Sequence, residues 1–192
     1  MRTEKGAEAT VEIGEGQVVK KRPEKKYRHE QLDEKIRKER TETEKNLLSE
    51  ANKYGVNVPE VKKKDASTLE LEKIEGETLK NKVENKPELL EKLGENISLL
   101  HSIDIIHGDL TTSNAIVKDS EVFLIDFGLA FRSQRTEDQA VDIHLLKQVL
   151  ESSHPEAVED SWESFLEGYR EYENSEEVLE QLEEVEQRGR YK

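Results

Sequence analysis

Two stretches of the sequence decide the fold: IHGDLTTSN at residues 106–114 and IDFG at residues 125–128. The first places an aspartate, Asp109, and an asparagine, Asn114, on one predicted loop. The residues between the two stretches read as a short β-hairpin, which returns the chain and brings Asp126 beside that loop. The spacing therefore predicts that three oxygen-bearing side chains meet at one place in the molecule.

Such a cluster suits phosphoryl transfer. The reaction needs a carboxylate at the attacking group and oxygen ligands for Mg²⁺, because negative charge builds up on the transferred group. We assign Asp109 as the catalytic base or orienting carboxylate, and Asn114 and Asp126 as metal ligands. An isolated Asp-Phe-Gly usually marks a turn after a strand, but the two motifs in this order around a hairpin are typical of protein kinases. The sequence thus predicts a kinase-like site for ATP and Mg²⁺.

The remaining pattern predicts an α+β, bilobal protein-kinase-like fold. A small β-rich N-lobe, residues 1–73, would hold a sheet and one long helix. The inner side of this helix would carry Leu32, Ile36, Leu47, Leu48 and Ala51. A reduced helical C-lobe, residues 74–192, would hold the catalytic loop, the Asp-Phe-Gly segment and a basic C-terminal tail. The expected strands lie near residues 10–13, 17–20, 56–61, 67–71, 115–117 and 122–125, and the helices near residues 30–54, 87–100, 138–150, 158–169 and 178–185.

A kinase-like site also needs a strand lysine that holds the phosphates, paired with a glutamate of the following helix. Lys20 ends the second predicted strand and Glu44 lies in the long helix. Lys21 and Glu42 are close competitors, and the pattern separates them poorly.

The rest of the nucleotide site has weaker signals. The segment KGAEA at residues 5–9 has one glycine and no G-x-G-x-x-G pattern, but the backbone of Gly6 and Ala7 could still cover phosphates. The segment joining the lobes, with Glu72 and Ile74, is the candidate to meet adenine through its backbone.

Two absences narrow the chemistry. Conventional protein kinases carry an arginine before the catalytic aspartate, and this arginine pairs with a phosphorylated activation loop; here the residue is Gly108. Only nine residues separate Gly128 from Asp138, with no Ala-Pro-Glu, so the usual peptide-docking platform does not fit. Either the phosphate acceptor is unusual, or ATP is hydrolysed in the service of a larger assembly.

Charge is unevenly distributed along the 192 residues, whose net charge is −14. Residues 20–64 hold 15 Lys/Arg against 9 Asp/Glu, a surplus of +6, whereas residues 151–187 hold 14 acidic residues against one arginine, or −13. One face could therefore meet phosphate or nucleic acid. The chain has no cysteine, which excludes disulfides, iron–sulfur clusters and thiol nucleophiles. It also lacks an apolar run of about 20 residues, so we expect a cytoplasmic protein without a membrane segment.

These residues resemble the small kinase subunit of the KEOPS complex, the PRPK-like family related to RIO kinases. The likeness covers nearly the whole chain, and the unfused length suggests an archaeal source. The segments that carry it are GAEA (6–9), KKRP (20–23), KYRH (26–29), Leu32-Asp33, Arg40-Thr41, HGDLTTSN (107–114), DFGL (126–129), Glu137-Asp138, Val141-Asp142 and RGR (188–190).

The resemblance implies a Mg-ATP-binding, atypical Ser/Thr kinase or ATPase that supports synthesis of N6-threonylcarbamoyladenosine at position 37 of tRNA. It assigns Lys20 and Glu44 as the lysine–glutamate pair and Asp109 as the acid/base. Its partners would be an ASKHA-fold threonylcarbamoyl-transferase subunit on the C-lobe and a further small subunit on the N-lobe. Arg188 and Arg190 would contact tRNA within the complex.

Two other functions share part of this pattern. A small-molecule phosphotransferase of the aminoglycoside type has the same His-Gly-Asp loop, but it needs a larger helical lobe to build an acceptor pocket. A non-catalytic scaffold could keep the fold as an assembly surface, and the scarcity of glycine near Gly6 is its only support. The complete set of predicted catalytic residues favours nucleotide chemistry.

Overall fold

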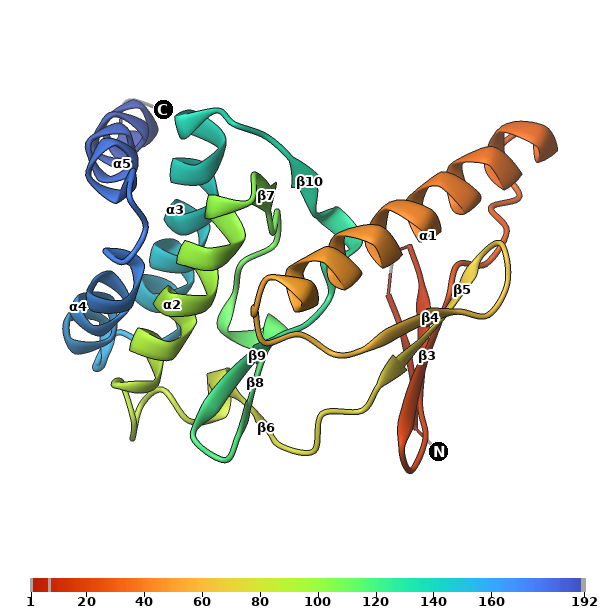
Figure 1. Ribbon diagram of the computed structural model, residues 1–192, viewed down its shortest axis with the longest axis horizontal. Coiled ribbons are helices and arrows are strands. Elements are labelled where there is room, and N and C mark those ends of the chain that lie inside the picture. Colours follow the sequence, from red (N-terminus) through yellow and green to blue (C-terminus); the bar gives the residue numbers. More distant parts are fainter. Residues whose placement is uncertain (1, 7, 191–192) are drawn as a thin grey trace.

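The computed structural model describes residues 2–6 and 8–190, without side-chain detail for 189 and 190. Its first part is an antiparallel sheet in the strand order β1-β2-β3-β5-β4, with α1 packed on β4 and β5. Figure 1 shows α1 crossing this sheet, with its N-terminal end projecting away from the body. The elements are β1 (Arg2–Lys5), β2 (Thr10–Ile13), β3 (Gln17–Lys21), α1 (Glu30–Lys53), β4 (Val61–Lys63) and β5 (Thr68–Glu72).

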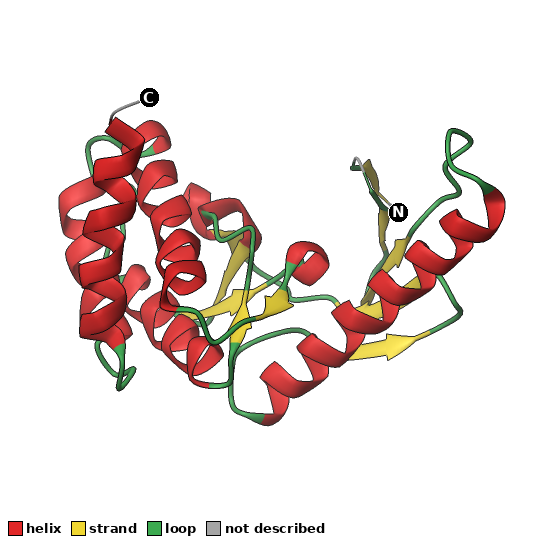
Figure 2. Ribbon diagram, turned by 90° about the horizontal axis from the view of Figure 1, so that it is seen from above, coloured by secondary structure: helices red, strands yellow, loops and turns green. Residues whose placement is uncertain are grey.

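The second part is mainly helical. Figure 2 shows its helices gathered at the end of the molecule opposite the five-stranded sheet. Two small antiparallel sheets, β6-β8-β9 and β10-β7, lie between. The elements are β6 (Glu77–Thr78), η1 (Leu79–Asn81), α2 (Leu89–Ser102), β7 (Ile105–Ile106), η2 (Thr112–Asn114), β8 (Ala115–Lys118), β9 (Glu121–Leu124), η3 (Phe127–Leu129), β10 (Phe131–Arg132), α3 (Thr136–Ser153), α4 (Val158–Tyr169) and α5 (Ser175–Arg190).

The core is centred on α2, whose leucine and isoleucine stripe is fully buried. Two glycines let α2 and α4 cross closely. A Cβ at Gly94 would lie 2.2 Å from the Phe165 carbonyl oxygen, and one at Gly168 would lie 2.1 Å from the Glu91 carbonyl oxygen. Neither position has room for a side chain, so this crossing fixes the helical part on which the catalytic loop rests.

Helix α1 connects the two parts. Its C-terminal half buries Leu47, Leu48 and Ala51 in the continuous core, and Glu50 forms an ion pair with Arg132 after the Asp-Phe-Gly segment. The expectation for Leu32 is wrong, because its side chain is 53% exposed on the projecting end. The buried apolar residues of α1 all lie in its C-terminal half, whereas Leu32 lies in its first turn.

The structure differs from the expected strands at two further places. Residues 56–60 are not a strand: Pro59 lacks an amide N–H, and the Asn57 N–H donates to the Asn96 side chain instead (2.7 Å). Strand β1 was not predicted, because all four of its residues are exposed and its sequence has no alternation of apolar and polar residues. The expected basic tail is helical through Arg190. The proposed lobe boundary at 73/74 falls in the segment between β5 and β6.

The long helices are too polar to cross a bilayer: in residues 2–6 and 8–190, none has both the length and the apolar character required.

Candidate functional site

The catalytic loop holds Asp109 and Asn114 together. The Asn114 amide donates to the Asp109 carboxylate (2.8 Å) and to its backbone carbonyl (2.9 Å). These bonds use the amide nitrogen, so the side-chain oxygen of Asn114 stays available to a cation. The Asp109 carboxylate is only partly buried, which leaves it accessible to a reacting group in the cleft.

Asp126 follows the β8–β9 hairpin in a left-handed conformation, with φ 61°. Non-glycine residues rarely adopt this conformation, and it is concentrated at functional sites. One carboxylate oxygen of Asp126 accepts bonds from the Gly128 N–H (3.1 Å) and from Lys20 Nζ (2.7 Å). Burial would raise the pKa of Asp126, but the charge and hydrogen bond of Lys20 outweigh it, so the pKa lies below its ordinary value. The group is therefore an anion at neutral pH.

The lysine–glutamate pair is Lys20 with Glu44, at 2.6 Å between Nζ and Oε1. Both side chains are buried. The two alternative residues do not form such a pair. Lys21 is exposed, and Glu42 pairs with Lys63 at the surface. The structure thus brings Lys20, Glu44 and Asp126 together, although they come from β3, α1 and the Asp-Phe-Gly segment.

Lys20 and Asp126 line a cleft of about 430 Å³ between the five-stranded sheet and the catalytic loop, whereas the buried carboxylate of Glu44 is not part of the lining. Its walls include Lys20, Asp109, Asp126 and Gly6. The Gly6 N–H donates to the Ala9 carbonyl (2.9 Å), which closes a tight turn over the cleft. The expectation for Ala7 lies outside the described residues.

The two residues assigned to the adenine side are not part of this wall. Glu72 ends β5, where its carboxylate accepts a bond from the Glu60 N–H (3.3 Å). Ile74 is buried in the segment that leads to β6. Neither side chain lines the cleft, so a role in adenine binding remains a prediction about their backbone.

The residues present fit a magnesium–nucleotide site. Asn114 and Asp126 offer one amide oxygen and one carboxylate, and Mg²⁺ typically takes one or two carboxylates together with substrate phosphates. Across residues 2–6 and 8–190, no three His, Cys, Asp or Glu side chains are arranged to hold a metal unaided. One carboxylate and one amide oxygen would leave most of the octahedral shell of Mg²⁺ to phosphates and water.

Asp142 on α3 supports the catalytic loop, a role that the sequence analysis missed. Its buried carboxylate accepts bonds from the backbone N–H groups of His107 and Gly108, both at 2.9 Å. The His101 ring lies 3.3 Å from it. Burial would raise the pKa of Asp142, but the hydrogen bond and charge of His101 lower it below the ordinary value. The Val141-Asp142 pair is part of the family resemblance, but nothing in the local sequence indicates that this aspartate binds the catalytic loop.

His107 and Gly108 explain why the loop has this shape. The His107 ring donates from Nε2 to the Ile125 carbonyl (3.1 Å) and accepts at Nδ1 from the Asp109 N–H (3.3 Å). This arrangement requires the neutral Nε2–H tautomer. Gly108 has φ +77°, and a Cβ there would lie 2.4 Å from the Leu129 carbonyl oxygen. An arginine at this position, as in conventional kinases, therefore has no room.

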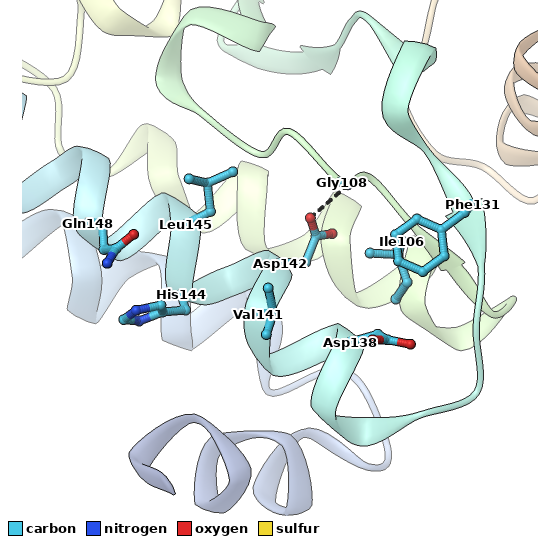
Figure 3. A pocket seen from close by; sticks show the side chains of 9 residues that line it. All are labelled: Ile106, Gly108, Phe131, Asp138, Val141, Asp142, His144, Leu145 and Gln148. Atoms are coloured by element: carbon cyan, nitrogen blue, oxygen red, sulfur yellow. Dashed lines mark hydrogen bonds between the residues drawn. The ribbon is translucent and has the colours of Figure 1, made fainter. Parts of the chain in front are cut away.

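A second hollow of about 250 Å³ lies behind the catalytic loop, between β7, β10 and α3. Figure 3 shows Ile106 and Phe131 on one side of it, Val141 and Leu145 along α3, and the Asp142–Gly108 bond at its floor. Phe131 is 42% exposed and Val141 is 49% exposed. The short connection from β10 to α3 leaves this apolar face open.

The two arginines assigned to tRNA lie on α5, far along the chain from the cleft residues. Arg188 pairs with Glu137 at 2.9 Å across to the start of α3. The side chain of Arg190 lies outside the described residues.

Comparison with known proteins identifies the family. The RIO domain matches residues 13–159. "KEOPS complex subunit Bud32" of Pyrococcus abyssi is 42% identical over 185 residues, which cover 91% of this chain and 84% of that protein. A "probable bifunctional tRNA threonylcarbamoyladenosine biosynthesis protein" of Methanoculleus marisnigri is 45% identical over 97% of this chain. The chain spans only 35% of the length of that relative.

Solved structures show the same fold at low sequence identity. The Rio2 kinase complex with ADP/Mg²⁺ and phosphoaspartate from Chaetomium thermophilum superposes with a TM-score of 0.65 and 14% identity, covering 98% of this chain and 70% of that one. Amicoumacin kinase gives a TM-score of 0.63 with 14% identity, covering 89% and 72%. The fold is therefore kinase-like, and the chain belongs to the RIO domain family, in the branch that includes KEOPS complex subunit Bud32.

Proposed function

We propose that this protein is the Mg-ATP-dependent ATPase and atypical Ser/Thr kinase subunit of a KEOPS complex. It would support formation of N6-threonylcarbamoyladenosine at position 37 of tRNA. The observation that carries the proposal is that Lys20, which is bonded to Glu44 and Asp126, lies in the cleft that Asp109 also lines. The names and identity of the relatives support the assembly and the tRNA pathway.

Each group of the site has a role that follows from its chemistry. Lys20 supplies positive charge to the phosphates, and Glu44 orients it. Asp109 orients the attacking hydroxyl or water and accepts its proton. Asn114 and Asp126 would hold Mg²⁺, which neutralises charge on the transferred phosphoryl group. The turn at Gly6 would cover the phosphates.

Hydrolysis of ATP is favoured over transfer to a protein substrate. β10 leads to α3 through residues 133–135 only, which leaves no chain for a peptide-docking platform. The loop glycine, Gly108, also excludes the arginine through which phosphorylation activates conventional kinases. Water is the acceptor that needs no such platform.

Equilibrium binding tests the nucleotide site separately from turnover. Titration of Mg-ATP into the isolated chain would give saturable binding that depends on Mg²⁺ under the proposal. An absence of binding would favour the scaffold. The likeness to amicoumacin kinase, at 14% identity, is one of fold alone.

For the C-lobe partner we propose the apolar face around Phe131 and Val141 as the docking site of the ASKHA-fold transferase subunit. Half-exposed apolar side chains around a hollow are typical of interaction surfaces, and the fused relatives carry a long additional segment. Val141→Glu should weaken binding of that subunit by about 10-fold or more, because a buried unpaired carboxylate is costly. Leu99→Glu, on exposed α2 surface, is the matched control. Equal affinities in calorimetry would place the partner elsewhere.

The small subunit would bind the N-lobe, and tRNA would meet Arg188 and Arg190. Deleting residues 188–192 removes three basic side chains. The slope of log K against log salt for tRNA binding by the complex should become shallower by roughly 2, at somewhat under one unit per phosphate contact. Filter binding at several salt concentrations measures it, and an unchanged slope would remove this end of α5 from the tRNA surface. We place the protein in the cytoplasm.

A further inference from the structure

Glu44 is bound by two cations, and the lysine–glutamate assignment accounts for only one. Lys20 Nζ lies 2.6 Å from Oε1, and Arg22 Nη2 donates to Oε2. Arg22 follows β3 two residues after Lys20, so an extended backbone turns both side chains to the same face. The Arg22 N–H donates to the Ser67 carbonyl at 2.9 Å, which holds the backbone there.

Arg22 is fixed in this place. Its side chain is 3% exposed and that of Glu44 is 2% exposed. The second terminal nitrogen of the guanidinium donates to the Thr41 hydroxyl on α1 (3.4 Å). Thr41 in turn donates to the Arg37 carbonyl (2.7 Å). Arg22 lines the nucleotide cleft beside Lys20, but its two terminal nitrogens are bonded to Thr41 and Glu44, which lie one turn apart on α1.

Lys20, in contrast, is shared. Its ammonium group bonds Glu44 on α1 and Asp126 in the Asp-Phe-Gly segment, at 2.6 and 2.7 Å. Without Arg22, two carboxylates would depend on one ammonium group, and one of them is buried. Without Lys20, Glu44 keeps Arg22, and the half-exposed Asp126 keeps water and the Gly128 N–H. The two cations are therefore not equivalent.

We propose that Arg22 is a positioning residue that anchors Glu44 and α1, so that Lys20 can turn to phosphates without leaving a buried carboxylate unpaired. The movement of Lys20 toward phosphates rests on the proposed function, whereas the anchoring of α1 by Arg22 does not. The anchoring of α1 is a property of the nucleotide-free protein, and it can be measured without ATP.

The first test is hydrogen exchange of α1 amides around Thr41 and Glu44 in the nucleotide-free protein. Arg22→Met should make this exchange about 10-fold faster, the loss expected for a charged hydrogen bond at a buried site. Lys20→Met should change it less than about twofold, because Arg22 still neutralises Glu44. Lys63→Met is the matched control, since it removes a surface cation from the α1 residue Glu42.

The second test is a double-mutant cycle on Mg-ATP affinity. Arg22→Met should weaken binding about 10-fold in the wild-type chain but less than about twofold in a Glu44→Gln background, because Arg22 acts through Glu44. Arg22→Lys keeps the charge but loses the two-pronged bond, and should give intermediate values in both measurements. If Arg22→Met does not fold, Arg22→Lys replaces it in both tests.

Two results would overturn the proposal. Wild-type exchange of α1 in both Arg22 variants would show that Arg22 does not anchor the helix. Equal losses of affinity in both backgrounds of the cycle would show that Arg22 contacts the nucleotide directly. If instead Lys20→Met leaves Mg-ATP binding intact, the proposed function fails, and the exchange measurement still decides the anchoring.

Discussion

Replacing Asp109 with asparagine is expected to lower ADP release from Mg-ATP by about 10³-fold, within the range that a general base contributes. The asparagine keeps the shape of the side chain but cannot accept the proton of the attacking group. Affinity for Mg-ATP should stay within about twofold, because in the proposed site the phosphates would be met by Lys20 and by the Mg²⁺ that Asn114 and Asp126 would hold. The measurement is single-turnover ADP release beside equilibrium nucleotide binding.

Asp119→Asn is the matched control for this substitution. Asp119 lies in the β8–β9 turn with φ 51°, a left-handed conformation that asparagine also tolerates, and its side chain is exposed. Its activity should equal that of the wild type. Retained turnover in Asp109→Asn would remove Asp109 from the chemistry, and loss of assembly with the partner subunits would show that the substitution acts on the fold.

Replacing Asp142 with alanine is expected to destabilise the protein by about 3–5 kcal/mol, as for other buried charged groups that lose their partner. The change leaves two backbone N–H groups of the catalytic loop, at His107 and Gly108, without an acceptor in a buried place. The free energy of unfolding from urea titration measures it. Glu151→Ala, an exposed acidic residue on the same helix, should change stability by less than about 0.5 kcal/mol.

The same residue gives the stability a pH dependence. Because the pKa of Asp142 is lower in the folded protein than its ordinary value, its stabilisation is complete above about pH 4, the ordinary aspartate pKa. It is lost as the pH falls through the folded value. The Asp142→Ala protein should therefore lose less stability between pH 5 and pH 3 than the wild type. Parallel pH profiles of the two proteins would contradict this account.

The sequence predicts the parts of the site whose signal is local. The catalytic loop, the hairpin and the Asp-Phe-Gly segment each have a short pattern, and the structure joins them as expected. Only tertiary contacts distinguish the pair Lys20 and Glu44 from the alternative residues Lys21 and Glu42. Nearby residues on a strand or helix point to different faces, and the sequence pattern does not show which face meets the site. The family resemblance already indicated Lys20 and Glu44, and the contacts in the structure agree with it.

The roles that the sequence analysis missed depend on contacts over long separations. Arg22 and Asp142 lie in segments that carry the family resemblance, but no local pattern indicates what they bind. Arg22 binds a helix residue 22 positions later, and Asp142 binds loop residues about 35 positions earlier. Strand β1 has no apolar residue that could reveal it, since only its backbone pairs with β2. Such elements are determined by the assembled fold, so local patterning cannot identify them.

The most direct test of the central claim is ADP release from Mg-ATP by the wild-type chain alone, and with the threonylcarbamoyl-transferase subunit and tRNA. Turnover should rise when the partners are added and disappear in the complex containing Asp109→Asn. Turnover that is indifferent to the partners would contradict the role in an assembly, and the absence of ADP in every mixture would contradict the enzymatic function itself.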